Sequence, residues 1–289
     1  MAACGRPAPA RPVPSPRRGW RVTFEAAAPM RLVSYNILDG GTGRETILGD
    51  VIEAQRADVV ALVEADRRDV VEHLAARLKM DFVHAPGNAH ASALMSRWPI
   101  RESINHAVLH PAKLEKSLLE AVVVEPANGT TPATGWTLGV VHLHAHETEE
   151  AERRREQELK VLLAAFETQR LAKSPHVVCG DFNANAPCQQ IDPARCNPLM
   201  RREWDENGGG VPRRVVQRML DAGYRDSLRE VSPAAAETGG TFMTEFPGQR
   251  VDYVFTFGFD RPKLKRAWIA SDAPAKDASD HYPVGLEIV

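Results

Sequence analysis

The chain has 289 residues, of which 43% are hydrophobic and 26% are charged, and its formal net charge is −2. It is long enough for one large domain or two small ones, and no apolar run approaches the roughly 18 residues of a membrane span, so we expect a soluble protein. Five arginines and one glutamate give residues 1–29 a charge of +4, which leaves −6 for the rest, and an acidic core disfavours tight non-specific binding to duplex nucleic acid.

Residues 1–29 are rich in Pro, Ala and Arg and show no hydrophobic periodicity. They also lack the apolar stretch of a secretory signal. Such a composition cannot bury a core, so we predict a disordered extension over 1–29 ahead of one domain over 30–289.

From Met30 onward, the pattern alternates between strands and helices. Strands are predicted at 31–36, 58–63, 82–84, 91–96, 117–124, 137–143, 176–179, 251–257, 265–270 and 284–288. Helices are predicted at 45–54, 67–79, 148–169 and 213–222, and an irregular stretch is predicted over 184–212. This order favours an α/β domain in which two sheets pack face to face with helices outside.

The four cysteines indicate a reducing environment. Cys179 stands in an apolar run and is expected to be a buried thiol. Cys188 and Cys196 could form a disulfide or contribute to a zinc site, but two reduced thiols in a loop are favoured. We therefore expect a cytoplasmic location.

Glu64 ends the apolar run that begins at Asp58. In α/β proteins, ligands collect at the carboxyl end of such a strand. A buried acid there needs a partner, and a metal ion would supply one.

Asp181 and Asn183 follow another apolar run, in which Gly180 permits an unusual backbone conformation. If the extended chain continues, the two side chains project to the same side. An anion beside a neutral amide suits a cation together with a phosphoryl oxygen or an attacking water. The alternative is that Asp181 and Asn183 form an Asx-type turn.

Asp280 and His281 stand in succession just before the last predicted strand. A carboxylate that holds a metal beside a histidine that handles protons is a recurring hydrolytic arrangement. Asp252 opens another strand and is expected to orient His281 by accepting its ring N–H.

His142, His144 and His146 alternate at the end of a predicted strand. If the strand persists, all three share one face, and three imidazoles with an open fourth position would make a catalytic zinc site. The alternative is one functional histidine, His142, followed by two loop residues.

Seven short segments occur in an order that resembles the endonuclease/exonuclease/phosphatase superfamily, the deoxyribonuclease-I-like fold. The resemblance covers about residues 30–289 and implies a four-layer α/β sandwich with Mg²⁺ or Mn²⁺ bound at one end of two packed mixed sheets. The segments are Tyr35-Asn36, Leu62-Val-Glu64, Ala93-Leu-Met-Ser-Arg-Trp-Pro-Ile100, Val141-His142-Leu143, Gly180-Asp-Phe-Asn183, Arg250-Val-Asp252-Tyr253 and Ser279-Asp-His281.

The resemblance also implies a role for each matching residue. Glu64 resembles the principal metal ligand, Asp280 resembles a second metal-site acid, and Asn36 resembles the asparagine near the metal and the phosphate. Asp181 resembles the residue that orients or deprotonates the attacking water, and Asn183 resembles a phosphate ligand. His142, and His281 paired with Asp252, resemble the histidines that stabilise the pentacovalent phosphorus.

Three positions depart from the family's pattern: Val63 stands where Gln is common, Ala91 where Gly is common, and Lys116 where Arg is frequent. The Asn-x-Tyr-x-Pro segment of abasic-site endonucleases is absent after His142, which does not favour a role in DNA repair.

We therefore expect a Mg²⁺-dependent hydrolase of phosphoesters, most simply a phosphodiesterase or nuclease. Single-stranded nucleic acid, lipid headgroups and small phosphodiesters are all compatible substrates, and no protein partner is implied. The alternatives are a zinc hydrolase centred on His142, His144 and His146, and a non-catalytic binding protein on the same fold.

Overall fold

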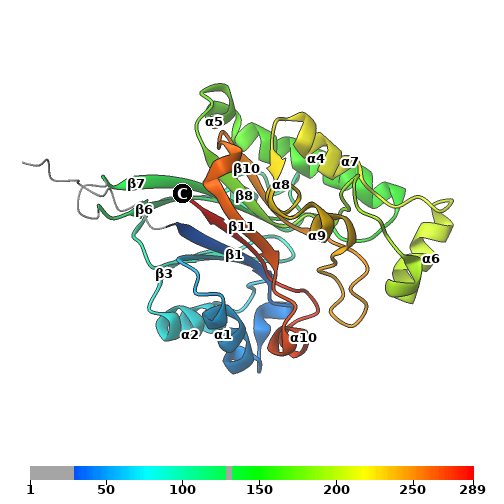
Figure 1. Ribbon diagram of the computed structural model, residues 1–289, viewed down its shortest axis with the longest axis horizontal. Helices are drawn as coiled ribbons and strands as arrows, with labels where there is room; N and C mark the ends of the chain where they lie inside the picture. Colours follow the sequence, from blue (N-terminus) through cyan, green and yellow to red (C-terminus); the bar gives the residue numbers. More distant parts are fainter. Residues whose placement is uncertain (1–28, 128–131) are drawn as a thin grey trace, which may run out of the picture.

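Twelve strands form two six-stranded sheets in the computed structural model, which describes residues 29–127 and 132–289 (Figure 1). The first sheet has the order β11-β12-β1-β2-β4-β3, and the second has the order β5-β6-β7-β8-β10-β9. The strands are β1 Met30–Asn36, β2 Val59–Val63, β3 Asp81–Ala85, β4 Ser92–Ser96, β5 Ile100–Asn105, β6 Ser117–Glu125, β7 Thr134–His142, β8 His176–Asp181, β9 Arg225–Asp226, β10 Asp252–Phe257, β11 Leu264–Ile269 and β12 Val284–Ile288.

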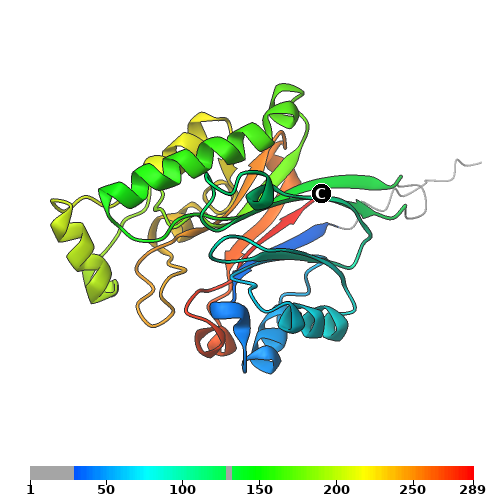
Figure 2. The same cartoon turned by 180° about the vertical axis from the view of Figure 1, so that it is seen from behind.

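Helices cover the outer faces of both sheets (Figures 1 and 2). The α-helices are α1 Glu45–Ala54, α2 Arg68–Leu78, α3 His106–Leu109, α4 Glu149–Ala165, α5 Glu167–Leu171, α6 Pro198–Glu206, α7 Arg214–Asp221, α8 Ser227–Val231, α9 Pro233–Thr238 and α10 Ala273–Ala278; the 3₁₀ helices are η1 Asp39–Gly41, η2 Pro193–Arg195 and η3 Arg261–Lys263. Helices α1, α2 and α10 pack on the first sheet, and α4 and α7 pack on the second. The four-layer sandwich expected from the sequence is confirmed.

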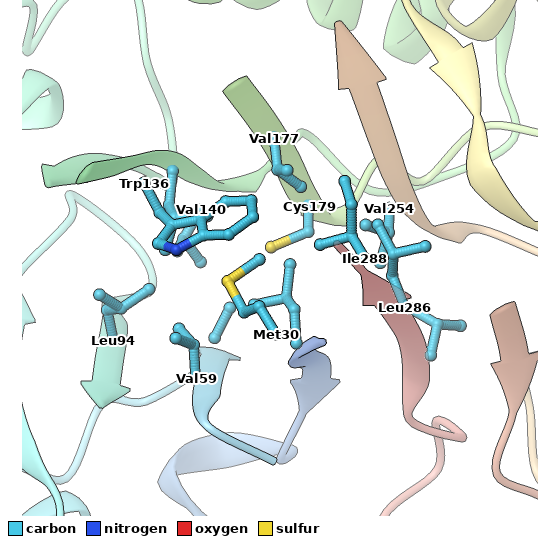
Figure 3. Close-up of a cluster of buried hydrophobic side chains, with 14 of the residues drawn as sticks. Met30, Val59, Leu94, Trp136, Val140, Val177, Cys179, Val254, Leu286 and Ile288 are labelled. Carbon is cyan, nitrogen blue, oxygen red and sulfur yellow. The ribbon is translucent and has the colours of Figure 1, made fainter. Parts of the chain in front are cut away.

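Alternation along the central strands builds the layers. In β1, Met30 and Leu32 point between the sheets, whereas Val33 and Tyr35 point toward the helices. Figure 3 shows Met30 between the sheets, near Cys179 of β8. Each of these side chains is fully buried, and burial of one such aliphatic side chain stabilises the fold by roughly 1.5–3 kcal/mol.

Several elements differ from those predicted. Strand β5 and helix α3 were not expected, and α6 lies inside the stretch predicted to be irregular. The long helix predicted over 148–169 is interrupted at Phe166, whose ψ of 14° ends α4 before α5 begins. The predicted extension over 1–29 lies, except for Pro29, outside the described residues.

The three cysteines that the structure describes in full, Cys179, Cys188 and Cys196, are free thiols, so the disulfide alternative for Cys188 and Cys196 is not formed. Burial raises the pKa of the Cys179 thiol to about 12, which makes this thiol unreactive. Over the described ranges, no helix is both long and apolar enough to cross a membrane.

Candidate active site

The chemically active side chains gather where the central strands of both sheets end. Strands β1 and β2 are parallel, with Asn36 opposite Val63, so Asn36 and Glu64 lie at the same edge. Strands β7 and β8 are also parallel and place His142 opposite Asp181. Strand β10 runs antiparallel to β8 and starts at this same edge with Asp252, opposite Asp181.

Asn36 connects the two sheets. Its Nδ2 lies 3.0 Å from Oε1 of Glu64 in the first sheet and 3.2 Å from Oδ2 of Asp181 in the second. Its Oδ1 accepts the backbone N–H of Leu38 at 3.0 Å. The buried amide therefore presents its nitrogen to the two carboxylates, while its oxygen is turned toward Leu38.

Glu64 sits just beyond β2 with φ of +53°, a conformation that is unusual for a residue other than glycine. Non-glycine residues in this region tend to cluster at functional sites. Burial raises the pKa of the carboxyl, but hydrogen bonds from the Asp39 N–H at 2.9 Å and from Asn36 outweigh that effect and lower it overall. Glu64 is therefore ionised and available to a cation.

Asp252 and His281 form the hydrogen bond expected from the sequence. His281 Nδ1 donates to Asp252 Oδ2 at 2.8 Å, and both side chains are buried. Burial disfavours the charged imidazole, but the Asp252 carboxylate more than compensates and raises the pKa of His281 to about 10. His281 Nε2 then lies 3.8 Å from Asp181 Oδ2.

Asp181 stands at the centre of the cluster. Burial raises the pKa of its carboxyl to about 6, although the neighbouring His281 acts in the opposite direction. Gly180 allows the chain to reach this position, because its φ is +138° and a Cβ there would lie 1.9 Å from the carbonyl oxygen of Val141.

The side chain of Asn183 does not project beside that of Asp181, as the sequence predicted for an extended chain. Strand β8 ends at Asp181, and Asn183 has φ of +47°, so the extended conformation does not continue to it. Instead, Asp181 Oδ1 accepts the Asn183 N–H at 2.8 Å, which is the Asx-type turn weighed as the alternative. The Asn183 amide donates to the carbonyl oxygen of Leu143 at 3.0 Å, beside the end of β7.

Lys116 contacts His142, a relationship that sequence reasoning missed. Lys116 Nζ lies 2.6 Å from His142 Nε2, which in turn lies 3.4 Å from Asp181 Oδ2. Burial, followed by the Lys116 charge, lowers the pKa of His142 well below its usual value, so the imidazole is neutral. His142 Nδ1 is buried and has no hydrogen-bond partner among the residues described.

His144 and His146 diverge from His142. Strand β7 ends at His142, His144 pairs with Glu115 at 2.6 Å, and His146 pairs with Glu203 at 3.2 Å. Within 29–127 and 132–289, the three histidines do not form a group close enough to share a metal ion. This geometry favours one histidine in the site followed by two loop residues.

Among the residues that the structure describes, two groups of side chains could hold a cation. Asp39, Glu64 and His90 form one, and Asp181, Asp252 and His281 form the other, with the ligand atoms of each group within 4.8 Å of one another.

Sequence reasoning did not single out Asp39 or His90. His90 stacks on His142 with ring centroids 5.5 Å apart and pairs with Asp66 at 2.8 Å. Asp39 begins the three-residue 3₁₀ helix η1, and His90 lies in the loop between β3 and β4, so no periodicity marks either residue.

Asp280 belongs to neither group, but it is half-buried between charged neighbours. Burial raises the pKa of its carboxyl, His281 lowers it, and Glu64 raises it further. The side-chain oxygen Oδ1 accepts only a long contact of 3.5 Å from the Ser279 hydroxyl, within the part of the chain described. Its carboxylate therefore has acceptor capacity left for a cation.

Comparisons with known proteins agree with this architecture. The sequence model of the endonuclease/exonuclease/phosphatase family matches residues 33–281. No curated protein sequence gives a significant match.

Among solved structures, a 3′-5′ exonuclease from Neisseria meningitidis is similar over 90% of this chain and 99% of its own, with 19% identity and a TM-score of 0.67. An AP endonuclease from Archaeoglobus fulgidus is similar over the same shares, with 16% identity and a TM-score of 0.64. The catalytic domain of Xenopus laevis APE2 is similar over 89% of this chain and 91% of its own, with 16% identity and a TM-score of 0.62. At these identities, the likeness concerns the fold.

Proposed function

The chain belongs to the endonuclease/exonuclease/phosphatase family, a family of phosphoric ester hydrolases, and from this premise we propose that it hydrolyses a phosphodiester bond with Mg²⁺, for which Mn²⁺ can substitute. The observation that carries the proposal is the Asn36 amide, which joins Glu64 of one sheet to Asp181 of the other. This contact brings a candidate cation ligand and a candidate proton acceptor to one point.

We assign the cation to Glu64 and Asp280. Their carboxylate oxygens are the ligands that a hard cation prefers, and both carboxylates are desolvated. When bound, the cation would stabilise the charge that develops on the phosphoryl oxygens. The Asn36 nitrogen donates to both carboxylates, so we assign Asn36 to positioning them. Its oxygen accepts one N–H, from Leu38, and keeps a second lone pair that it can offer to the cation.

Asp181 is proposed to orient the attacking water and take its proton. A pKa of about 6, raised by burial, suits a base that works near neutral pH. The Asn183 N–H holds Oδ1 at 2.8 Å, which fixes the carboxylate and leaves Oδ2 toward the centre of the cluster. Asn183 is therefore proposed to have two roles: its backbone N–H holds the Asp181 carboxylate in place, and its side-chain amide contributes to substrate binding.

The positive side of the site is proposed to bind the phosphate. His281, kept charged by Asp252, can donate from Nε2 to a phosphoryl oxygen. His142 is neutral, so the positive charge beside it is that of the Lys116 ammonium group. The His142 imidazole is proposed to hold and orient this ammonium group.

A panel assay tests this function directly. The substrates are single-stranded DNA, RNA, a bis-aryl phosphate and phosphoinositides, each with Mg²⁺, with Zn²⁺ and with EDTA. Turnover that EDTA abolishes and Mg²⁺ restores supports the proposal. Turnover with Zn²⁺ alone, abolished by substitution of His144 or His146, would favour the zinc hydrolase, and binding without turnover would favour a non-catalytic protein.

A further inference from the structure

A pocket of about 610 Å³ lies beside α6, and none of the residues assigned to catalysis lines it. Its volume falls within the range of small-molecule sites, roughly 300–1,000 Å³. Apolar side chains form much of its wall, among them Ile191, Pro198 and Val211. Such walls favour a flat organic group over a bare ion.

The same pocket carries positive charge. Arg201, Arg202 and Arg213 line it, and Asp205 is the single acid among its lining residues, which gives a net charge of +2. The Nε of Arg201 is buried and has no hydrogen-bond partner in the described part of the chain. An unpartnered guanidinium N–H in a positive, apolar pocket calls for an anionic acceptor.

A chain of contacts links this pocket to the candidate active site. Trp204, which lines the pocket, donates from Nε1 to Glu147 at 2.9 Å, and Glu147 accepts a second hydrogen bond from Gln249 at 2.9 Å. Phe242 forms backbone bridges to both Gln249 and His281, and its ring lies 4.5 Å from the His281 imidazole. The pocket is thus held in a fixed position relative to His281.

A second connection runs along the loop that follows His142. The Nη1 of Arg155 donates to the carbonyl oxygens of His144 at 3.0 Å and His146 at 2.6 Å, and His146 pairs with Glu203 of α6. Helix α6 itself projects at the end of the molecule toward which β1 runs, the end where the site residues gather (Figures 1 and 2). The loop therefore leads from the reacting centre to the pocket.

We propose that this pocket binds a nucleotide that flanks the scissile phosphodiester of a single-stranded nucleic acid. A nucleotide combines an anionic phosphate with a flat base, and an arginine guanidinium can both bind phosphate and stack on a base. A lone inorganic phosphate would satisfy the arginines but not the apolar walls. The inference rests on the phosphodiester hydrolysis proposed above.

The test compares two substrates in the full-length protein. In the Arg201→Ala/Arg202→Ala variant, KM for an eight-residue oligo(dT) should rise roughly tenfold or more, because alanine cannot make charge-assisted hydrogen bonds to a phosphate, while kcat stays unchanged. The kinetic constants for bis(4-nitrophenyl) phosphate should not change, because this small diester occupies only the reacting centre.

The matched control removes two exposed arginines from the far ends of the strands, as Arg101→Ala/Arg225→Ala. Arg101 follows Ile100, which pairs with Val123, toward the end of β6 remote from the end that pairs with His142. Arg225 pairs with Thr256, at the other end of β10 from Asp252. This control removes the same charge and should leave both substrates' KM values near wild type.

Binding of a fluorescent oligo(dT) octamer, followed by anisotropy in EDTA, gives a second readout that needs no turnover. The Arg201→Ala/Arg202→Ala variant should bind roughly tenfold more weakly, and its salt dependence should flatten by about 0.7 in log–log slope for each phosphate that the arginines neutralise in the wild type. Unchanged oligonucleotide affinity, or an equal weakening in the control, would overturn the pocket assignment. Absence of any phosphodiesterase activity in the wild type would instead overturn the proposed function, and the binding measurement would still decide on the pocket.

Discussion

Asp252 and His281 are 29 residues apart in the chain, yet His281 Nδ1 lies 2.8 Å from Asp252 Oδ2. Asp252 opens β10 of the second sheet, and His281 lies in the segment that leads into β12 of the first sheet. The contact keeps the imidazole charged and its Nε2–H directed toward the cluster around Asp181. The two side chains therefore form one unit.

Two residues that act as a unit should show non-additive losses. Asp252→Asn and His281→Ala should each lower the rate of phosphodiester hydrolysis by roughly 10²-fold or more, the scale of positioned acid–base groups. The double mutant should be scarcely slower than the slower single mutant. Steady-state kinetics of the three variants check this, and a double-mutant loss equal to the product of the single losses would show that the residues act independently.

The three histidines after β7 should differ in importance. His142→Ala should cost orders of magnitude in rate, because His142 is buried against Lys116 and Asp181. His144→Ala and His146→Ala should cost little, because these histidines pair with surface acids. The measurement is kcat/KM together with bound-metal content, and comparable losses at all three positions with loss of bound zinc would point to the rival zinc site.

Lys116 should act through His142 as well as through its charge. Lys116→Met should slow hydrolysis by roughly 10²-fold and raise the pKa of His142, because a positive neighbour that disfavours the imidazolium is removed. The matched control is Lys116→Arg, which keeps the charge and should leave that pKa low. NMR titration of the His142 ring provides the readout, and an unchanged His142 pKa in Lys116→Met would show that the contact has no electrostatic effect.

The buried ion pair between Arg250 and Asp226 should matter for stability. Arg250 Nη2 lies 2.7 Å from Asp226 Oδ2, and both side chains are almost inaccessible to solvent. Arg250→Met leaves the buried Asp226 carboxylate without its charged partner and should lower the free energy of unfolding by about 3–5 kcal/mol. In urea denaturation, Arg153→Met, which breaks an exposed pair with Glu149, should cost less than about 1 kcal/mol. A similarly small loss for Arg250→Met would contradict the structural role of the pair.

Apolar patterning predicted the central strands because these strands are buried on both faces. Strands β2 and β8 carry nearly continuous apolar runs, and the polar residues that end those runs, Glu64 and Asp181, are among those the fold brings together. The order of the seven short segments added the pairing of Asp252 with His281, which the structure places in contact.

Elements without a core-facing pattern were missed. Strand β5 is an edge strand whose four central residues are exposed, and α6 buries only Trp204, so neither displays hydrophobic periodicity. The Lys116–His142 contact joins the residue before β6 to the last residue of β7 through side-chain geometry that no local pattern encodes. The side chain of Asn183 does not project to the same side as that of Asp181, as an extended chain would require. Asn183 instead has a left-handed backbone in a turn, in which its N–H donates to the Asp181 carboxylate.

Hydrolysis by Glu64→Gln at saturating Mg²⁺ tests the central claim, that a cation held at Glu64 drives phosphodiester cleavage. Gln keeps the size of the side chain and its contact with the Asp39 N–H but removes the charge, so the fold should be retained and the activity abolished. Mg²⁺ should also raise the Tm of the wild type and not that of the variant, since a ligand stabilises only the protein that binds it. Near-normal turnover of a bis-aryl phosphate by Glu64→Gln at saturating Mg²⁺ would contradict the account.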